Sequence, residues 1–346
     1  MSTGNDSSSP LYLGIDLGTS QTAIMSNRGA QSLVRSVVGY PKDIIGIRLL
    51  NDTRLVGQEA IDKRSYMNLH YPLEDGVLKE ASDRQTKAAK ELLEYAIKQV
   101  QPKTGEQISA ILGVPARASV NNKNQLLRIA HELVDFAVVV SEPFMVAYGL
   151  GRLTNAIIID IGAGTIDLCA MKGTVPAPED QITLLKAGNY VDELLTSSME
   201  ESYPHVQVNQ LIAKKIKEKH GYVGESTSEM IVSVRSEGRP VSVDLSREIR
   251  LACEAILPDI LESLEELVTH FDPEDQEEAL KNIIIAGGGS RIAGLPQALM
   301  NHLAGHGEVH VTCVADPQFA GAAGALKLAT ELPQEYWSQV GDVIGS

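Results

Sequence analysis

Two short segments of the chain place a carboxylate and small residues directly after an apolar run. Asp16-Leu17-Gly18-Thr19-Ser20 follows residues 11–15, and Asp160-Ile161-Gly162-Ala163-Gly164-Thr165 follows residues 156–159. An apolar strand in this position delivers the carboxylate at its carboxyl end, and small residues then let backbone N–H groups approach an anion closely. Two such turns facing each other could hold one polyphosphate between them.

A third glycine-rich turn, Ala286-Gly287-Gly288-Gly289-Ser290, follows residues 282–285 and precedes a helical pattern. Each turn alone is common in ordinary loops, but three strand-to-turn units in one chain favour nucleotide binding. The sequence has no Gly-x-x-x-x-Gly-Lys-[Ser/Thr] motif and no Gly-x-Gly-x-x-Gly motif after its first strand. These two absences argue against the P-loop and dinucleotide-binding folds.

A triphosphate bound by glycine turns also needs a divalent cation, which usually keeps several of its waters. Neither acidic turn contains a lysine, so Mg²⁺ and backbone dipoles have to neutralise most of the phosphate charge. We therefore expect nucleotide binding to depend strictly on Mg²⁺. Asp16 and Asp160 are the expected metal residues, through bound water.

Glu142 is the candidate for orienting or deprotonating the water that attacks the terminal phosphate. It follows the expected buried strand that ends at residues 138–141 and precedes Pro143, a residue favoured in the first turn of a helix. The carboxylate is thus expected at a helix N-terminus, where it could equally serve only to complement the helix dipole. Position alone leaves both roles open.

The first acidic turn is predicted to join two strands of a hairpin, 11–17 and 21–26. After it, helical and apolar strand patterns alternate, which is typical of a parallel sheet covered by helices. An interior proline, Pro258, is expected to bend one long helix over 245–271. The other expected elements are helices over 86–100, 121–136, 192–201, 207–219 and 291–302, and strands at 108–114, 138–140, 157, 182, 282–286 and 309–314.

The length of 346 residues suits two domains of ordinary size. Breaks in the hydrophobic pattern predict an inserted small subdomain in each. We expect the following organisation: a disordered tail over 1–10; domain I over 11–154 plus 316–346, with an insert over about 34–80; and domain II over 155–315, with an insert over about 189–244.

The composition, 43% hydrophobic and 22% charged, is that of a globular protein. The net charge of −15 argues against nucleic acid or an anionic membrane as a partner. Cys169, Cys253 and Cys313 are too widely spaced to suggest a disulfide framework or a zinc site, which favours reduced thiols. The polar residues 1–10 are not typical of a signal peptide, and no apolar run approaches membrane-spanning length.

The three turns, in this order, resemble those of the actin, heat-shock chaperone and sugar kinase superfamily. The turn residues concerned are 13–20, 159–165 and 286–294. Other segments narrow the resemblance to bacterial actins of the MreB type: 72–77, 113–116, 141–145 and 316–318. Residues 37–43 and 172–176 are similar to the MamK group, the filament actins of magnetosomes. The resemblance runs from Leu11 to the end of the chain.

This resemblance implies an α/β, actin-like ATPase fold, with two duplicated ribonuclease-H-like domains, four subdomains and a nucleotide cleft between the domains. It implies ATP or ADP and Mg²⁺ as ligands, and catalytic roles for Glu142, Asp160 and Thr165. Without the resemblance, Lys217–Lys219 would be predicted only as a solvated helix face. The nucleotide-binding residues implied are Asp16, Gly18, Thr19, Ser20, Gln21, Gly162, Ala163, Gly164, Thr165, Gly188, Asp192, Lys217, Glu218, Gly287, Gly288, Gly289 and Arg291.

The function implied is a cytoskeletal ATPase that polymerises on binding ATP-Mg, disassembles after hydrolysis and positions magnetosomes from the cytoplasm. Its expected partners are copies of itself in a two-stranded filament, a paralogous actin and an adaptor of the organelle. A small-molecule kinase, a chaperone-type ATPase and a non-polymerising regulatory ATPase remain alternatives. One departure is Ile166, where MreB-like chains usually have a second threonine; strand alternation predicts that Ile166 faces away from the phosphates.

Overall fold

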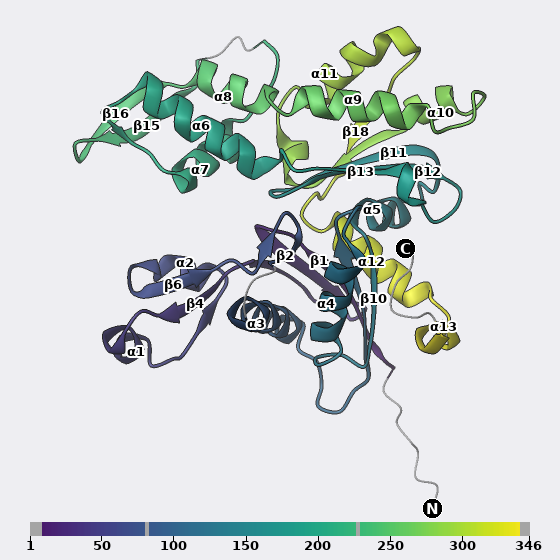
Figure 1. The fold of residues 1–346 in the computed structure, drawn as a ribbon, viewed down its shortest axis with the longest axis horizontal. Coiled ribbons are helices and arrows are strands. Elements are labelled where there is room, and N and C mark those ends of the chain that lie inside the picture. The colour runs from purple at the N-terminus through teal and green to yellow at the C-terminus, as the bar shows by residue number, and fades with distance from the viewer. Residues whose placement is uncertain (1–8, 80–82, 226–228, 340–346) are drawn as a thin grey trace, which may run out of the picture. The chain divides into compact units, whose positions relative to one another are not determined.

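The computed structural model describes residues 9–79, 83–225 and 229–339 (Figure 1). It divides into two compact units, Met1–Gly151 with Gln318–Ser346 (unit 1) and Arg152–Pro317 (unit 2). The predicted tail 1–10 lies mostly outside the described residues. None of the helices within the described ranges is long and apolar enough to cross a membrane.

Unit 1 is built on a five-stranded mixed sheet in the order β10-β9-β1-β2-β3. Three strands form an antiparallel meander: β1 (Leu11–Leu17), β2 (Gln21–Ser26) and β3 (Gln31–Arg35). Two parallel strands, β9 (Ile108–Val114) and β10 (Phe136–Ser141), continue the sheet beside β1. The predicted hairpin 11–17/21–26 is therefore confirmed.

Unit 2 repeats this topology in the order β13-β12-β11-β17-β18. The meander consists of β11 (Thr154–Ile161), β12 (Ile166–Lys172) and β13 (Gln181–Leu184), and the parallel strands are β17 (Ile283–Ala286) and β18 (Val311–Cys313). In both units, the first hairpin of the meander ends in an acidic turn. The chain therefore contains one strand arrangement twice.

Side chains alternate across each sheet, and this places each acidic residue on a defined face. In unit 1, Leu11, Leu13 and Ile15 face a core shared with α3 (Asp83–Gln99) and α4 (Val120–Ala130). The opposite face, with Gly14 and Asp16, is covered by α12 (Ala320–Glu331). In unit 2, Ile159 and Ile161 face the apolar core, so Asp160 lies on the other side of its sheet.

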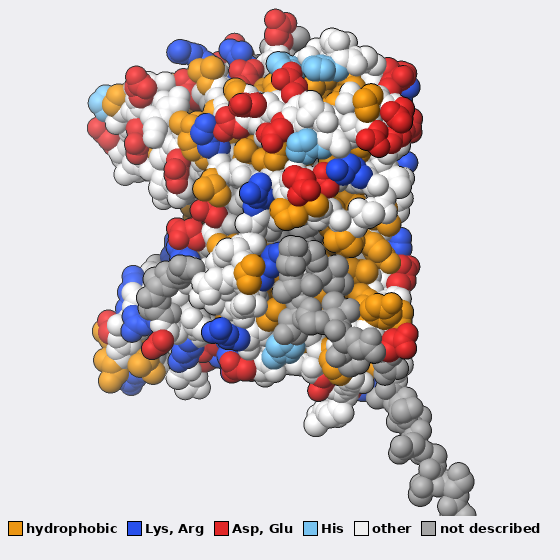
Figure 2. All heavy atoms as spheres, turned by 45° about the vertical axis from the view of Figure 1, so that its right-hand side comes forward, with side chains coloured by type: hydrophobic (Ala, Val, Ile, Leu, Met, Phe, Trp, Pro, Cys, Tyr) orange, Lys and Arg blue, Asp and Glu red, His pale blue; other side chains and the backbone are white. Residues whose placement is uncertain are grey.

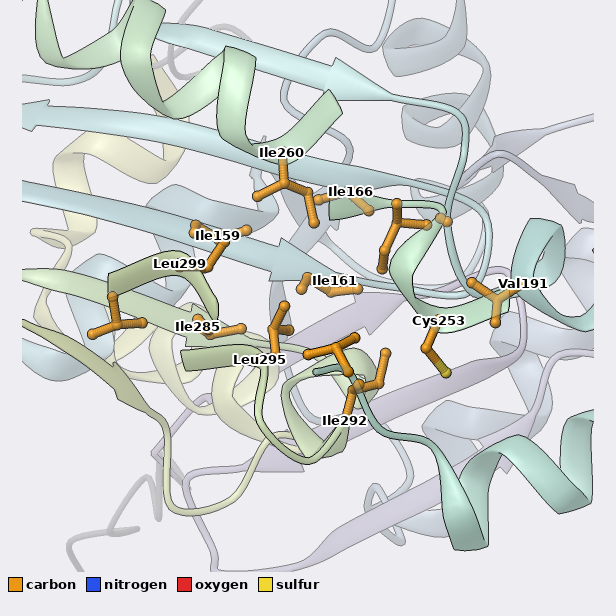
Figure 3. Packing of buried hydrophobic residues seen from close by; sticks show 14 of the residues in the cluster. Ile159, Ile161, Ile166, Val191, Cys253, Ile260, Ile285, Ile292, Leu295 and Leu299 are labelled. Carbon is orange, nitrogen blue, oxygen red and sulfur yellow. The ribbon is translucent and has the colours of Figure 1, made fainter. Parts of the chain in front are cut away.

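The helices of unit 2 bury their apolar faces on this core, as Figure 3 shows. Leu295 and Leu299 of α11 (Leu295–Leu303) point toward Ile285 and Ile159 of the strands. Ile166 has no exposed surface and belongs to the same cluster. The other helices of unit 2 are α6 (Gly188–Ser202), α7 (Gln210–His220), α8 (Ser246–Glu254), α9 (Leu257–Val268) and α10 (Gln276–Leu280).

The prediction of one bent helix over 245–271 is wrong, because α8 ends at Glu254 and α9 begins at Leu257. Pro258 lies in the first turn of α9, where its missing N–H costs nothing, so the chain breaks the helix instead of bending it. The helix predicted from 291 begins only at Leu295, after a 3₁₀ turn over Gly288–Arg291 and Gly294 at φ 81°. The helix predicted over 121–136 ends at Ala130.

The remaining elements are short. In unit 1, a three-stranded sheet in the order β5-β4-β6 and a small hairpin, β7-β8, follow the meander, with two short helices between the strands. In unit 2, β14, β15 and β16 form a further three-stranded sheet. Their bounds are β4 (Val38–Pro41), α1 (Ile44–Leu50), β5 (Leu55–Val56), α2 (Gln58–Asp62), β6 (Met67–His70), β7 (Leu73–Glu74), β8 (Val77–Leu78), α5 (Glu142–Leu150), β14 (Val206–Gln207), β15 (Ile231–Ser236), β16 (Arg239–Asp244) and α13 (Gln334–Gln339).

Candidate functional site

Two buried hydroxyl groups, those of Thr22 and Ser36, support the backbone of the first acidic turn. Ser36 Oγ donates a hydrogen bond to the Gly18 carbonyl oxygen at 2.7 Å, and the Thr22 and Ser36 hydroxyls lie 3.0 Å apart. Thr22 and Ser36 are 0% and 1% exposed. Buried hydrogen bonds of this kind fix the path of the backbone. The turn is therefore a preformed loop.

The same turn is also tied to the end of β3 and to the segment that follows it. The Gly76 N–H donates to Thr19 Oγ1 at 2.8 Å, and Arg35 Nη1 donates to Ser20 Oγ at 3.5 Å. Gly76 belongs to the predicted insert over about 34–80. The structure thus connects the candidate phosphate turn directly to that insert.

Asp16 rests against the first turn of α12. A Cβ atom at Gly321 would lie 2.5 Å from Asp16 Oδ2, so only glycine allows the helix backbone this close to the carboxylate. Asp16 also pairs in register with Gly113 of the neighbouring strand β9. Its position is fixed by backbone on two sides.

Glu142 also lies next to Gly113. A Cβ atom at Gly113 would lie 3.2 Å from Glu142 Cγ and would overlap Met145 Cε. Glu142 is 9% exposed and is the first residue of α5, with Ser141 as N-cap and Pro143 next to it. Unit 1 thus gathers Glu142 and Asp16 around Gly113, two candidates separated by more than a hundred residues in sequence.

In unit 2, the third glycine turn packs on the end of β11. Gly287 has a φ of 71°, and a Cβ atom there would overlap Asp160 Oδ1. A Cβ atom at Gly289 would overlap Ile161 Cγ2, whereas Gly288 has open space around it. The second and third turns therefore form one structure, in which the Asp160 carboxylate rests on the backbone of Gly287. Arg291, which follows this turn, is exposed.

The second acidic turn is anchored by the start of α6. The Gly188 N–H donates to the Gly162 carbonyl at 3.1 Å, and the Asn189 N–H donates to the Ala163 carbonyl at 2.7 Å. Within the turn, the Gly162 N–H donates to the Thr165 carbonyl at 2.9 Å. Gly188, a predicted site residue, thus contacts the turn as a structural support.

Lys217 of α7 supports the same turn indirectly, because it contacts Gly188 and Asp192 of α6. Its Nζ atom donates to the Gly188 carbonyl at 2.6 Å and lies 2.7 Å from Asp192 Oδ1. Asp192 is 2% exposed; burial raises its pKa, and the nearby ammonium of Lys217 opposes that rise. The predicted residues Gly188, Asp192 and Lys217 are therefore together, whereas Glu218 is exposed.

Asp167 is a buried carboxylate that the predictions from the sequence do not include. Asp167 pairs with Asp160 across the hairpin and is 0% exposed. Thr183 Oγ1 donates to Asp167 Oδ1 at 2.6 Å. Directly paired residues lie on the same face of a sheet, so two carboxylates lie next to each other there. The available signal was the hairpin itself, which brings Asp167 back opposite Asp160.

Replacing Lys217 by methionine is expected to destabilise the protein by about 3 kcal/mol, because it leaves the carboxylate of Asp192 buried without its counter-charge. Loss of the support for Gly188 should also weaken nucleotide binding. Urea unfolding and titration with a fluorescent ATP analogue measure the two effects. Lys219→Met, at an exposed position on the same helix, is the matched control and should change neither.

The effect should also depend on pH. Without the ammonium of Lys217, nothing opposes the rise in the pKa of Asp192 that burial causes. When folding raises the pKa of a carboxyl group, the folded protein loses stability as the pH rises through that pKa. The destabilisation by Lys217→Met should therefore be smaller at about pH 5 than at about pH 7.5. The double variant Lys217→Met, Asp192→Asn should recover most of the loss; equal destabilisation at both pH values would contradict the assigned ion pair.

The carboxylate oxygens of both acidic turns are suitable ligands for a magnesium ion. Mg²⁺ prefers carboxylate oxygen, keeps several waters and is usually held by one or two carboxylates together with substrate phosphates. Asp16 and Asp160 each present a carboxylate seated on a glycine backbone. Over the part of the chain that the structure describes, no group of three or more His, Cys, Asp or Glu side chains could hold a metal alone.

Comparison with known proteins places this geometry in a family. The family model for the MreB/Mbl protein matches residues 11–335, which include all three glycine turns. The chain is 54% identical to the actin-like protein MamK of Paramagnetospirillum magneticum over 336 residues, or 97% of each chain.

Solved structures give the same result. A MamK double helical filament has a TM-score of 0.92 and 53% identity, covering 93% of this chain and 99% of that one. A non-polymerising MamK mutant bound to AMPPNP has a TM-score of 0.73 and 52% identity, with coverage of 93% and 99%. The chain therefore belongs to the MreB/Mbl protein family and has an actin-like fold.

Proposed function

We propose that this protein is an actin-like ATPase that polymerises on binding ATP-Mg and disassembles after hydrolysis. The observation that carries the proposal is the repetition of one acidic hairpin turn in two units of the same strand order. In each unit, the carboxylate at the turn is seated on a glycine backbone. The similarity to a MamK filament supports polymerisation, and the similarity to an AMPPNP-bound MamK mutant supports nucleotide binding.

In this proposal, both turns bind one nucleotide. Unit 1 contributes Asp16, Gly18, Thr19, Ser20 and Gln21. Unit 2 contributes Gly162, Ala163, Gly164 and Thr165 to the phosphates, and Gly188, Asp192, Lys217, Glu218, Gly287, Gly288, Gly289 and Arg291 to the rest of the nucleotide or to the positioning of the turn. The duplicated sheet supports a division into two domains. We propose domain I over 11–154 plus 316–346 and domain II over 155–315, with inserts at about 34–80 and 189–244.

Glu142 would orient the attacking water and accept its proton, with Thr165 helping to position that water. Its seat against Gly113, next to Asp16, supports this role, because the carboxylate then lies beside the first phosphate turn. Asp16 and Asp160 would hold a magnesium ion through water, and that ion would neutralise charge on the phosphates. Asp167 would add negative charge beside Asp160.

Hydrolysis would set the lifetime of the filament. If contacts between subunits favour the ATP-bound state, loss of the terminal phosphate would weaken that preference by about 1 to 3 kcal/mol. Because the chain is similar to the actin-like protein MamK, and its residues 37–43 and 172–176 resemble those of the magnetosome actins, we further propose that the filament lies in the cytoplasm beside magnetosomes and positions them. We propose that copies of the protein form a two-stranded filament, and that a paralogous actin and an adaptor of the organelle are its other partners.

Sedimentation and electron microscopy with ATP, ADP and AMPPNP test the proposal. We expect filaments with ATP and AMPPNP, slower disassembly with AMPPNP, and little polymer with ADP. ATP turnover without any pelletable polymer would contradict it and favour the non-polymerising ATPase. Transfer of phosphate to a small-molecule acceptor would favour the kinase.

A further inference from the structure

Arg35 places a positive charge beside the first acidic turn. It is the last residue of β3, and its Nη1 atom donates to Ser20 Oγ at 3.5 Å. In the strand pairing, Arg35 lies opposite Gln21, and Asp16 lies opposite Ala23, two residues further along β2. Directly paired residues share a face of a sheet, and so do residues two apart on one strand. Arg35 and Asp16 are therefore on the same face of the sheet of unit 1.

The half-buried guanidinium of Arg35 makes few contacts within the protein. A guanidinium has five N–H donors. Within the described ranges only Nη1 has a hydrogen-bond partner, at a distance that is long for such a bond. Over the same ranges no acidic side chain lies within ion-pairing distance of Arg35, whereas Arg28 pairs with Glu106 and Arg54 with Glu91. The charge of Arg35 and most of its donors are thus available to a ligand.

The net charge of the chain makes a local cation important for an anionic ligand. Unit 2 contains 13 Lys or Arg and 26 Asp or Glu, and unit 1 contains 17 and 19. Unit 2 therefore carries −13 of the net charge of −15. Figure 2 shows acidic side chains spread over the part of the molecule that unit 2 forms. Such a distribution repels a polyphosphate, so positive charge at the binding turns has to offset the repulsion.

We propose that Arg35 binds a phosphate group of the nucleotide at the first acidic turn. Neither acidic turn contains a lysine, and Lys217, which supports the second turn, is already paired with Asp192. The planar guanidinium can donate two parallel hydrogen bonds to phosphate oxygens, and its hydrogen bond to Ser20 keeps it at the turn. The proposal rests on the proposed nucleotide binding and adds a side-chain cation to it.

Arg35→Gln and Arg35→Lys separate this role from a purely structural one. Glutamine keeps an N–H donor for Ser20 but has no charge, whereas lysine keeps the charge. With saturating Mg²⁺, and at protein concentrations too low for pelletable polymer, Arg35→Gln should bind a fluorescent ATP analogue about tenfold or more weakly. Arg35→Lys should lose about threefold or less, because a lysine still attracts phosphate as a point charge.

Arg128→Gln is the matched control for the change in net charge. It removes one positive charge from an exposed position of α4 in the same unit, and it should leave the affinity for the ATP analogue unchanged. The melting temperature without nucleotide should be the same in all three variants, because Arg35 has no ion pair to lose among the described residues. Added NaCl should weaken binding more in the wild type than in Arg35→Gln, since salt screens the lost attraction.

The outcomes distinguish this inference from the proposed function. Wild-type affinity of Arg35→Gln, or an equal loss in Arg35→Gln and Arg35→Lys, would overturn the phosphate contact. Normal nucleotide binding by Arg35→Gln combined with impaired ATP-driven pelleting would assign Arg35 to a contact between copies and refute the inference. Absence of ATP binding by the wild-type protein would instead overturn the proposed function.

Discussion

Replacing Glu142 by alanine should lower the rate of ATP hydrolysis by a factor of about 10² to 10⁴ while ATP-driven polymerisation remains. The carboxylate lies at the start of α5 and against Gly113, the neighbour of Asp16, so its loss removes the proposed base and leaves the first acidic turn intact. The variant should form filaments that disassemble slowly. Phosphate release measures the first effect, and light scattering after ATP depletion measures the second.

The alternative role of Glu142 predicts a different result. If the carboxylate serves only the helix dipole, the alanine variant should lose about 0.3 to 1 kcal/mol of stability and hydrolyse ATP normally. Glu132→Ala is a suitable control, because Glu132 is an exposed carboxylate that pairs with Lys90. Normal disassembly of Glu142→Ala filaments would refute the catalytic assignment.

Replacing Gly324 by alanine should destabilise unit 1 by about 3 kcal/mol or more. A Cβ atom at Gly324 would overlap the carbonyl oxygen and carbon of Met145, where α12 crosses α5. Neither contact is the end of a flexible side chain, so a helix has to move. Glycine to alanine within a helix normally stabilises it by about 0.5 to 1 kcal/mol, so the expected sign is opposite to the ordinary one.

Urea unfolding measures this effect, with Gly305→Ala as the control. Gly305 has no atom within 4 Å of an added Cβ and no positive φ, so its replacement should be nearly neutral. Because α5 begins with Glu142 and α12 contacts Asp16 through Gly321, Gly324→Ala should also reduce ATP turnover. A Gly324→Ala variant as stable as wild type would show that the helices separate at little cost.

The sequence predicts the two acidic turns and the first hairpin well for a local reason. In each, an apolar strand, a carboxylate and small turn residues are contiguous, so pattern and turn chemistry agree. The helix break at Pro258 was harder to place, because a proline can bend a helix or begin a new one, and only packing decides. Helix α1 was not predicted, since its isoleucines follow no amphipathic period and face outward.

The contacts that support the site could not be read from the sequence. Gly321 touches Asp16, and Gly287 touches Asp160, but nothing local distinguishes these glycines from others in turns or helices. Lys217 on pattern alone belongs to a solvated face, whereas the structure pairs it with the buried Asp192. Asp167 was missed because its significance comes from the register of the hairpin opposite Asp160.

The most direct test of the central claim is a crystal structure of the protein with ATP and Mn²⁺, in which anomalous scattering locates the metal. We expect a single manganese peak at the phosphates, within about 4 to 5 Å of both the Asp16 and the Asp160 carboxylates, the reach of one metal-bound water. Metal or nucleotide bound at one of these carboxylates, with the other in a separate cavity, would contradict the account.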